Sequence, residues 1–101
     1  MITASHFRDA SILSVAISYD WQTSSHKAEL CVVGPDQLPR RYAISKLSSY
    51  SVADDFAATH ISQCTLLATP GRVYLSLDPY TEGHESDKDA FVFIGQALSV
   101  R

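Results

Sequence analysis

The sequence contains few of the residues that mark specialised folds: two cysteines, four glycines, four prolines and one tryptophan in 101 residues. Cys31 and Cys64 stand singly in apolar segments, without the C-x-x-C spacing of metal or redox sites. We therefore expect two small buried thiols and no disulfide. No apolar run approaches the roughly 20 residues that a membrane-spanning helix needs. The start of the chain lacks the basic and apolar regions of a secretory signal, which predicts a cytoplasmic protein.

Motifs of the common enzyme classes are also missing from the sequence. It contains no P-loop, no dinucleotide-binding glycine pattern and no G-x-S-x-G nucleophile elbow. The side chains that remain as candidates for nucleophilic catalysis are Cys31, Cys64, His6, His60 and Asp54 or Asp55. His60 and Cys64 straddle a predicted junction between a helix and a strand, so their spacing does not place them on one face. We assign no residue to catalysis, to a cofactor or to a metal.

The composition is that of an ordinary globular domain. Hydrophobic residues make up 46% of the chain and charged residues 19%, and a chain of this length buries roughly two-thirds of its extended surface on folding. No linker, repeat or low-complexity tract divides the sequence. We expect a single domain over residues 1–101.

The first half of the chain shows the alternation of a β-meander. Between Ile12 and Trp21, apolar residues recur at every second position from Leu13, which predicts a half-buried strand whose large side chains close the core. A polar loop over residues 22–26 leads to a second strand over 27–34. A third strand is expected over Arg40–Leu47, after a loop with two prolines.

The second half begins with a different pattern. Ser51 and Asp54 resemble a capping box, and Val52 and Phe56 are spaced i, i+4, which predicts one short helix over about 52–59. A turn at Thr69–Arg72, with Gly71 at the position of positive φ, predicts a hairpin of two strands. The apolar segment Ala90–Val100 predicts a central strand with a bend at Gly95.

These elements give about six antiparallel strands and one short helix. The fold class is therefore mainly β, at the border of α+β, with a curled sheet or a small sandwich that covers its own apolar face.

The negative charge of the chain is concentrated in one segment. Residues 78–89, here called the acidic loop, contain a single lysine and five carboxylates: Asp78, Glu82, Glu85, Asp87 and Asp89. The rest of the chain has seven basic and six acidic residues, so a general attraction to nucleic acid is not expected. A hydrated connector between two strands, with its carboxylates turned outward, could attract a basic partner.

The acidic loop partly matches a calcium-binding pattern. With Asp78 as position one, Glu82, Gly83 and Asp89 fall at positions five, six and twelve of an EF-hand loop. Position three is Tyr80, and the flanking segments are strands, which argues against such a site. A small-molecule or metal-binding module that uses residues 78–89 remains the alternative function.

Three segments together resemble small β-rich bacterial proteins, many uncharacterised and some known as immunity proteins of polymorphic toxin systems. These segments are HFRDASILSVAIS, KAELCVV and YLSLDPYTEGHESDKDAFVFIG. The resemblance implies a cytoplasmic, non-enzymatic protein that binds and neutralises a toxin. We expect the five carboxylates of the acidic loop to contact a basic toxin, and a homodimer is compatible with the edge strands of a small sheet. A small hydrolase is the less favoured reading.

Overall fold

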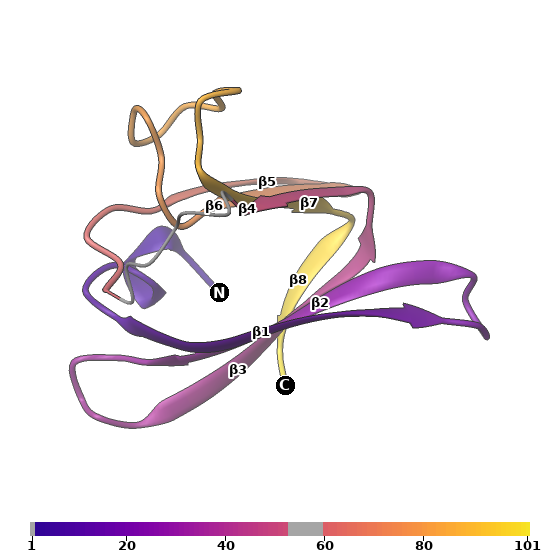
Figure 1. Cartoon of the computed structure of the whole chain (residues 1–101), viewed down its shortest axis with the longest axis horizontal. Coiled ribbons are helices and arrows are strands. Elements are labelled where there is room, and N and C mark those ends of the chain that lie inside the picture. Colours follow the sequence, from indigo (N-terminus) through magenta and orange to yellow (C-terminus); the bar gives the residue numbers. More distant parts are fainter. Residues whose placement is uncertain (1, 53–59) are drawn as a thin grey trace.

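The structure, a computed structural model, describes residues 2–52 and 60–101. It is mainly β, with one 3-10 turn, η1 (Ala4–His6), and two antiparallel sheets of four strands each (Figure 1). Sheet A has the order β1-β2-β3-β8, and sheet B has the order β4-β7-β6-β5. The strands are β1 (Ser11–Asp20), β2 (Ser25–Val33), β3 (Pro39–Leu47), β4 (Ser49–Val52), β5 (Thr65–Thr69), β6 (Arg72–Ser76), β7 (Phe91–Gly95) and β8 (Ala97–Val100).

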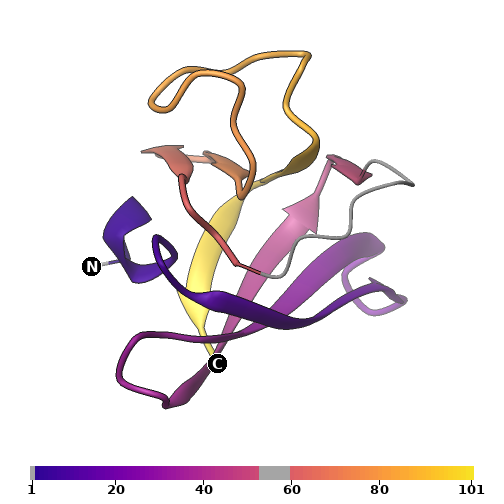
Figure 2. The same ribbon diagram turned by 60° about the vertical axis from the view of Figure 1, so that its left-hand side comes forward.

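Two paired chain segments pass from one sheet into the other at a shared corner. β3 continues into β4 through Ser48, and β7 continues into β8 through Gln96, so the two segments run side by side through both sheets (Figure 2). The Ser48 amide donates to the Ile94 carbonyl and the Gln96 amide donates to the Ser45 carbonyl, each at 2.8 Å. The described residues therefore form six extended segments, of which two are bent across the corner.

This arrangement confirms the predicted mainly β, antiparallel fold, although the described strands number eight. The predicted bend at Gly95 is the corner between β7 and β8, so one predicted strand is two strands in different sheets. β4, with the sequence SYSV, was not predicted, because Ser51 and Val52 were assigned to the start of the helix; in the structure β4 pairs with β7. Most of the helix predicted over 52–59 lies outside the described residues, and Val52 is the last residue of β4.

One apolar core joins the two sheets. Leu30 and Ile44 from sheet A and Leu75 and Phe93 from sheet B are each at most 1% exposed and belong to one cluster. Phe7, which follows η1, is fully buried in the same cluster. Burial of one such aromatic side chain stabilises the fold by about 1.5–3 kcal/mol. The segment before β1 therefore contributes to the core directly.

The predicted inward face of β1 is wrong at Leu13, Tyr19 and Trp21, which are all exposed. The register between β1 and β2 shifts at Leu13, which is the extra residue of a β-bulge and is 59% exposed. Trp21 lies one residue past the end of β1 and is 85% exposed, with its ring 4.8 Å from that of Tyr19. Val15 and Ile17 pack against the core as expected. The bulge and the end of the strand interrupt the alternation on which the prediction rested.

Both cysteines are buried and free, as predicted. No helix in the described part of the chain is long and apolar enough to cross a bilayer.

Candidate functional site

The acidic loop connects β6 to β7 and rises from sheet B on the side away from sheet A (Figure 1). Hydrogen bonds close its base: the Leu77 amide donates to the Phe91 carbonyl at 2.9 Å, and the Ala90 amide donates to the Asp78 carbonyl at 3.4 Å. The position of the loop between two neighbouring strands was predicted correctly. Its internal structure was not predicted, because distant residues determine it.

Asp89 is a buried anchor of the loop and is only 6% exposed. One of its carboxylate oxygens accepts a hydrogen bond from the Tyr74 hydroxyl, and the other accepts the Tyr80 amide at 2.8 Å. The Tyr74 hydroxyl also accepts the Ser86 amide at 3.3 Å. Burial, with the hydrogen bond to Asp89 as the next cause, raises the pKa of Tyr74 to about 12. Tyr74 is therefore a neutral donor at physiological pH.

Glu82 ties the loop to two other parts of the chain. Its carboxylate accepts the Cys64 amide at 3.0 Å and pairs with the Arg8 guanidinium, also at 3.0 Å. The bond from Cys64 is the main cause that lowers the pKa of Glu82, and Arg8 lowers it further. The next amide, from Gly83, donates to the Thr65 hydroxyl at 2.9 Å. This half of the loop is held against the segment that leads into β5.

Glu85 forms a two-point ion pair with Arg72, the first residue of β6. The two guanidinium nitrogens of Arg72 lie 2.6 and 2.9 Å from the two carboxylate oxygens. Their hydrogen bonds lower the pKa of Glu85. Fork-to-fork pairs of this kind fix orientation as well as charge.

The expectation that all five carboxylates turn outward is wrong for Asp89, which is buried, and two of the four exposed carboxylates are already paired inside the protein. Asp89, Glu82 and Glu85 bind Tyr74, Arg8 and Arg72. Asp78 and Asp87 are exposed and form no ion pair with any residue of the described ranges. Of the five carboxylates in the acidic loop, only those of Asp78 and Asp87 could be neutralised by a partner without breaking an ion pair or hydrogen bond inside the protein.

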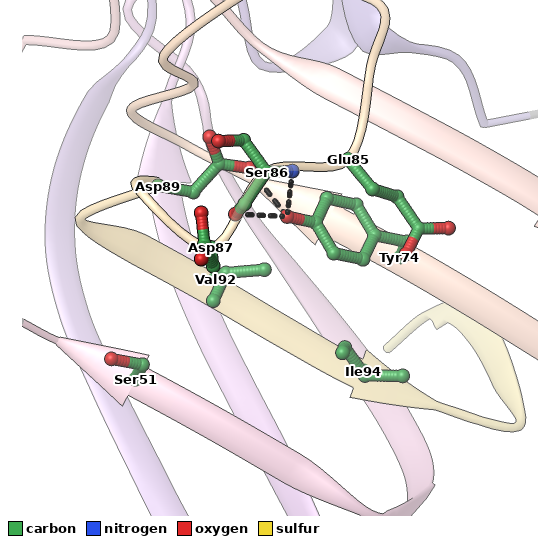
Figure 3. A pocket seen from close by; sticks show the side chains of 8 residues that line it. All are labelled: Ser51, Tyr74, Glu85, Ser86, Asp87, Asp89, Val92 and Ile94. Atoms are coloured by element: carbon green, nitrogen blue, oxygen red, sulfur yellow. Dashed lines mark hydrogen bonds between the residues drawn. The ribbon is translucent and has the colours of Figure 1, made fainter.

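A pocket of about 360 Å³ lies between the loop and the outer face of sheet B (Figure 3). Its apolar part comes from Val92 and Ile94 on β7, and its polar part comes from Ser51, Tyr74, Glu85, Ser86, Asp87 and Asp89. In the close view, the side chains of the loop lie above the strands that carry Val92, Ile94 and Ser51. A cavity with an apolar floor and carboxylates above it suits a cation on an aliphatic stem.

Sequence reasoning missed the residues that sheet B contributes to this pocket. Tyr74 alternates with Val73 and Leu75 in β6, so its side chain points away from the core. Val92 and Ile94 alternate in the same way with Phe91 and Phe93. The double-sided apolar pattern of β7 was the available signal, since it implied that something covers the outer face as well.

The calcium-loop alternative gains no geometric support. Glu82 and Asp89, two of the matching positions, bind different protein partners and do not converge. Within residues 2–52 and 60–101, no group of three or more histidine, cysteine, aspartate or glutamate side chains is arranged to hold a metal ion.

The residues considered for catalysis are dispersed. Cys64 is 1% exposed, and burial raises the pKa of its thiol to about 12, so it is not a nucleophile at neutral pH. His60 lies 3.6 Å from Asp9 in an exposed pair, and His6 accepts the Thr3 amide at the start of η1. Asp54 and Asp55 lie outside the described residues.

No family model, curated protein or solved structure matches this chain.

Proposed function

We propose that this protein is a non-enzymatic protein-binding domain that recognises a basic segment of its partner through the acidic loop. The observation that carries the proposal is the pocket between the loop and sheet B, with Val92 and Ile94 as its floor and Asp87 beside it. A lysine or arginine side chain can lay its aliphatic stem on such a floor and place its charge near the carboxylate. Asp78 supplies a second unpaired charge on the same loop.

The surrounding charge favours a local contact over a broad electrostatic surface. Arg8 and Arg72 already neutralise Glu82 and Glu85, and Lys88 lies over the ring of Tyr80 at 4.7 Å from its centre. The net negative charge offered to a partner is therefore smaller than the sequence implies. Charges of this kind contribute mainly to association rate and specificity.

The resemblance to immunity proteins indicates a biological role for this binding. In that role the protein acts in the cytoplasm, and its partner is a basic toxin whose surface the acidic loop covers. This role rests on the resemblance and on the acidic loop, and the partner's identity would test it directly.

The binding surface can be tested without a known partner. We expect a short lysine- and arginine-rich peptide to shift the amide NMR signals of residues 85–89, Val92 and Ile94, and a neutral peptide of equal length to leave them in place. The double variant Asp78→Asn/Asp87→Asn should bind the basic peptide with roughly tenfold lower affinity at low salt. Glu29→Gln, which removes a carboxylate on sheet A, is the matched control and should bind as the unchanged protein does.

The proposal would be contradicted if the amide NMR signals shifted only in other parts of the molecule. It would also be contradicted if the double variant bound the peptide as tightly as the control does. Neutralising all five carboxylates at once is a poor test, because Asp89, Glu82 and Glu85 hold the loop in place.

The same pocket supports one alternative function, the binding of a small organic cation. Its volume is within the range of small-ligand sites, and its lining joins apolar side chains to carboxylates. Titration with a set of alkylamines and polyamines separates the two functions: a small-molecule site would bind one amine much more tightly than it binds the basic peptide.

A further inference from the structure

β1 forms one border of sheet A and has an unusually open edge. Its ladder partner is β2, and on the other side the described residues give it only a single bridge, between Ser11 and His60. β1 has ten residues, whereas the other border strands have four or five: β4, β5 and β8. Among residues 2–52 and 60–101, no strand pairs with the rest of this edge, and its backbone groups can pair with a strand of another molecule.

The usual protections of an edge strand are sparse in β1. From Ser11 to Tyr19 it contains no charged residue and no proline, and its bulge at Leu13 leaves the stretch Ser14–Tyr19 regularly paired with β2. Ser14, Ala16 and Ser18 are exposed and small, so they leave room for a second backbone. A long, uncharged edge of this kind is a site of strand addition.

The sequence of β1 is complementary to itself when it is read in the opposite direction. With Ala16 at the centre of an antiparallel pair, Val15 lies opposite Ile17 of a second copy, and Ser14 lies opposite Ser18. Both Val15 and Ile17 are only partly buried in the single chain. Apolar side chains then meet on the core side of the sheet and small polar ones on the outer side.

Exposed apolar side chains flank this paired stretch. Leu13 is 59% exposed and Tyr19 is 39% exposed, and in the same register the two lie across from each other at each end. No like charges oppose each other over the stretch, because the nearest charged residue, Asp20, lies opposite Ile12 of the second copy. The register therefore pairs Val15 with Ile17 and Leu13 with Tyr19, and it places small uncharged side chains opposite one another between them.

We propose that the protein forms a symmetric homodimer in which β1 pairs antiparallel with β1 of a second copy, centred on Ala16. Such an isologous contact closes on itself, since each copy uses the same edge. It joins the two A sheets into one continuous sheet. It is independent of the acidic loop, which rises from sheet B.

Sedimentation velocity over a wide range of protein concentrations tests the dimer, with the mass of two chains as the expected result. Ala16→Lys places two ammonium groups directly opposite each other at the centre of the contact and should weaken the dimer roughly tenfold or more. Ala16→Glu should do the same, and an equimolar mixture of the two variants should restore a heterodimer. Because Ala16 is exposed, both variants should keep the circular dichroism and melting temperature of the folded monomer.

Ser99→Lys is the matched control, since it adds the same charge to β8 at the opposite border of sheet A. It should leave the dimer intact. A protein that stays monomeric at all concentrations would overturn the proposal. So would a dimer that Ser99→Lys dissolves, or one that persists in both Ala16 variants. Failure of the mixture to associate would contradict the register centred on Ala16.

Discussion

The hydroxyl of Tyr74 donates a hydrogen bond to the buried carboxylate of Asp89, and this bond fastens the acidic loop to sheet B. Tyr74 comes from β6, whereas Asp89 lies at the far end of the loop that follows. Because the same Asp89 also accepts the Tyr80 amide, one carboxylate organises both ends of the connection.

Replacing Tyr74 with phenylalanine should destabilise the protein by about 1–3 kcal/mol, because a buried carboxylate loses one of its donors. Urea denaturation, followed by circular dichroism, measures the change. Tyr80→Phe is the control, since that ring is 65% exposed and its contact with Lys88 does not use the hydroxyl. It should change the free energy of unfolding by less than about 0.5 kcal/mol. Equal effects of the two variants would contradict the role of the bond.

Stability should fall between about pH 10 and pH 12. The pKa of Tyr74 is raised to about 12 in the folded protein, while an unfolded tyrosine titrates near 10. Below both values the proton is bound in both states and the stabilisation is complete. As the pH rises, the unfolded chain loses its proton first, so unfolding becomes more favourable.

Melting temperatures across this interval, with tyrosinate absorbance measured in parallel, check the alkaline decline. Tyr74→Phe should reduce the decline without abolishing it, because burial raises the pKa of Tyr42 as well. An unchanged slope in the variant would show that Tyr74 is not responsible.

Gly95→Ala should destabilise the fold by roughly 1–3 kcal/mol, because the corner has no room for a methyl group. A Cβ there would lie 2.9 Å from the Ser45 carbonyl oxygen and would overlap the side chain of Ile44. Gly34→Ala is the control, because a Cβ at that position meets only the side-chain ends of Asp36 and Arg40, at 3.3 Å and beyond. Thermal unfolding of both variants measures the difference. A similar decrease of the melting temperature in the two variants would contradict the importance of the close approach at Gly95.

The Cys64 thiol should resist a disulfide reagent in the native protein at pH 8. Its pKa of about 12 leaves very little thiolate, and the side chain is 1% exposed. A Cys31→Ser variant isolates its reaction. We expect slow labelling in buffer and rapid labelling in denaturant, and fast labelling of the folded variant would contradict the burial of Cys64.

The sequence predicted the local parts of this fold well. Alternation located β1, β2 and β3, and the Pro70-Gly71 turn placed the β5–β6 hairpin, where Gly71 has a φ of +85°. Gly95 was recognised as a bend. Each of these features depends on residues that are neighbours in the chain.

The features that the sequence did not reveal depend on distant partners. β4 is a strand because β7 lies beside it. Glu82 is paired because Arg8 and the Cys64 amide lie beside it, and both are distant from it in sequence. The carboxylate of Asp89 is buried against Tyr74, 15 residues earlier in the chain. Composition could locate the charge but could not say which part of it was already neutralised.

The shared corner has a consequence for how the protein unfolds. Because β3 runs into β4 and β7 runs into β8, the β3–β8 pair of sheet A is covalently continuous with the β4–β7 pair of sheet B. Neither half can melt while the other keeps its ladder intact at the junction. The protein should accordingly lose its structure in one cooperative transition, with the same midpoint whether a probe reports on the Trp21 end or on the loop beside Tyr74.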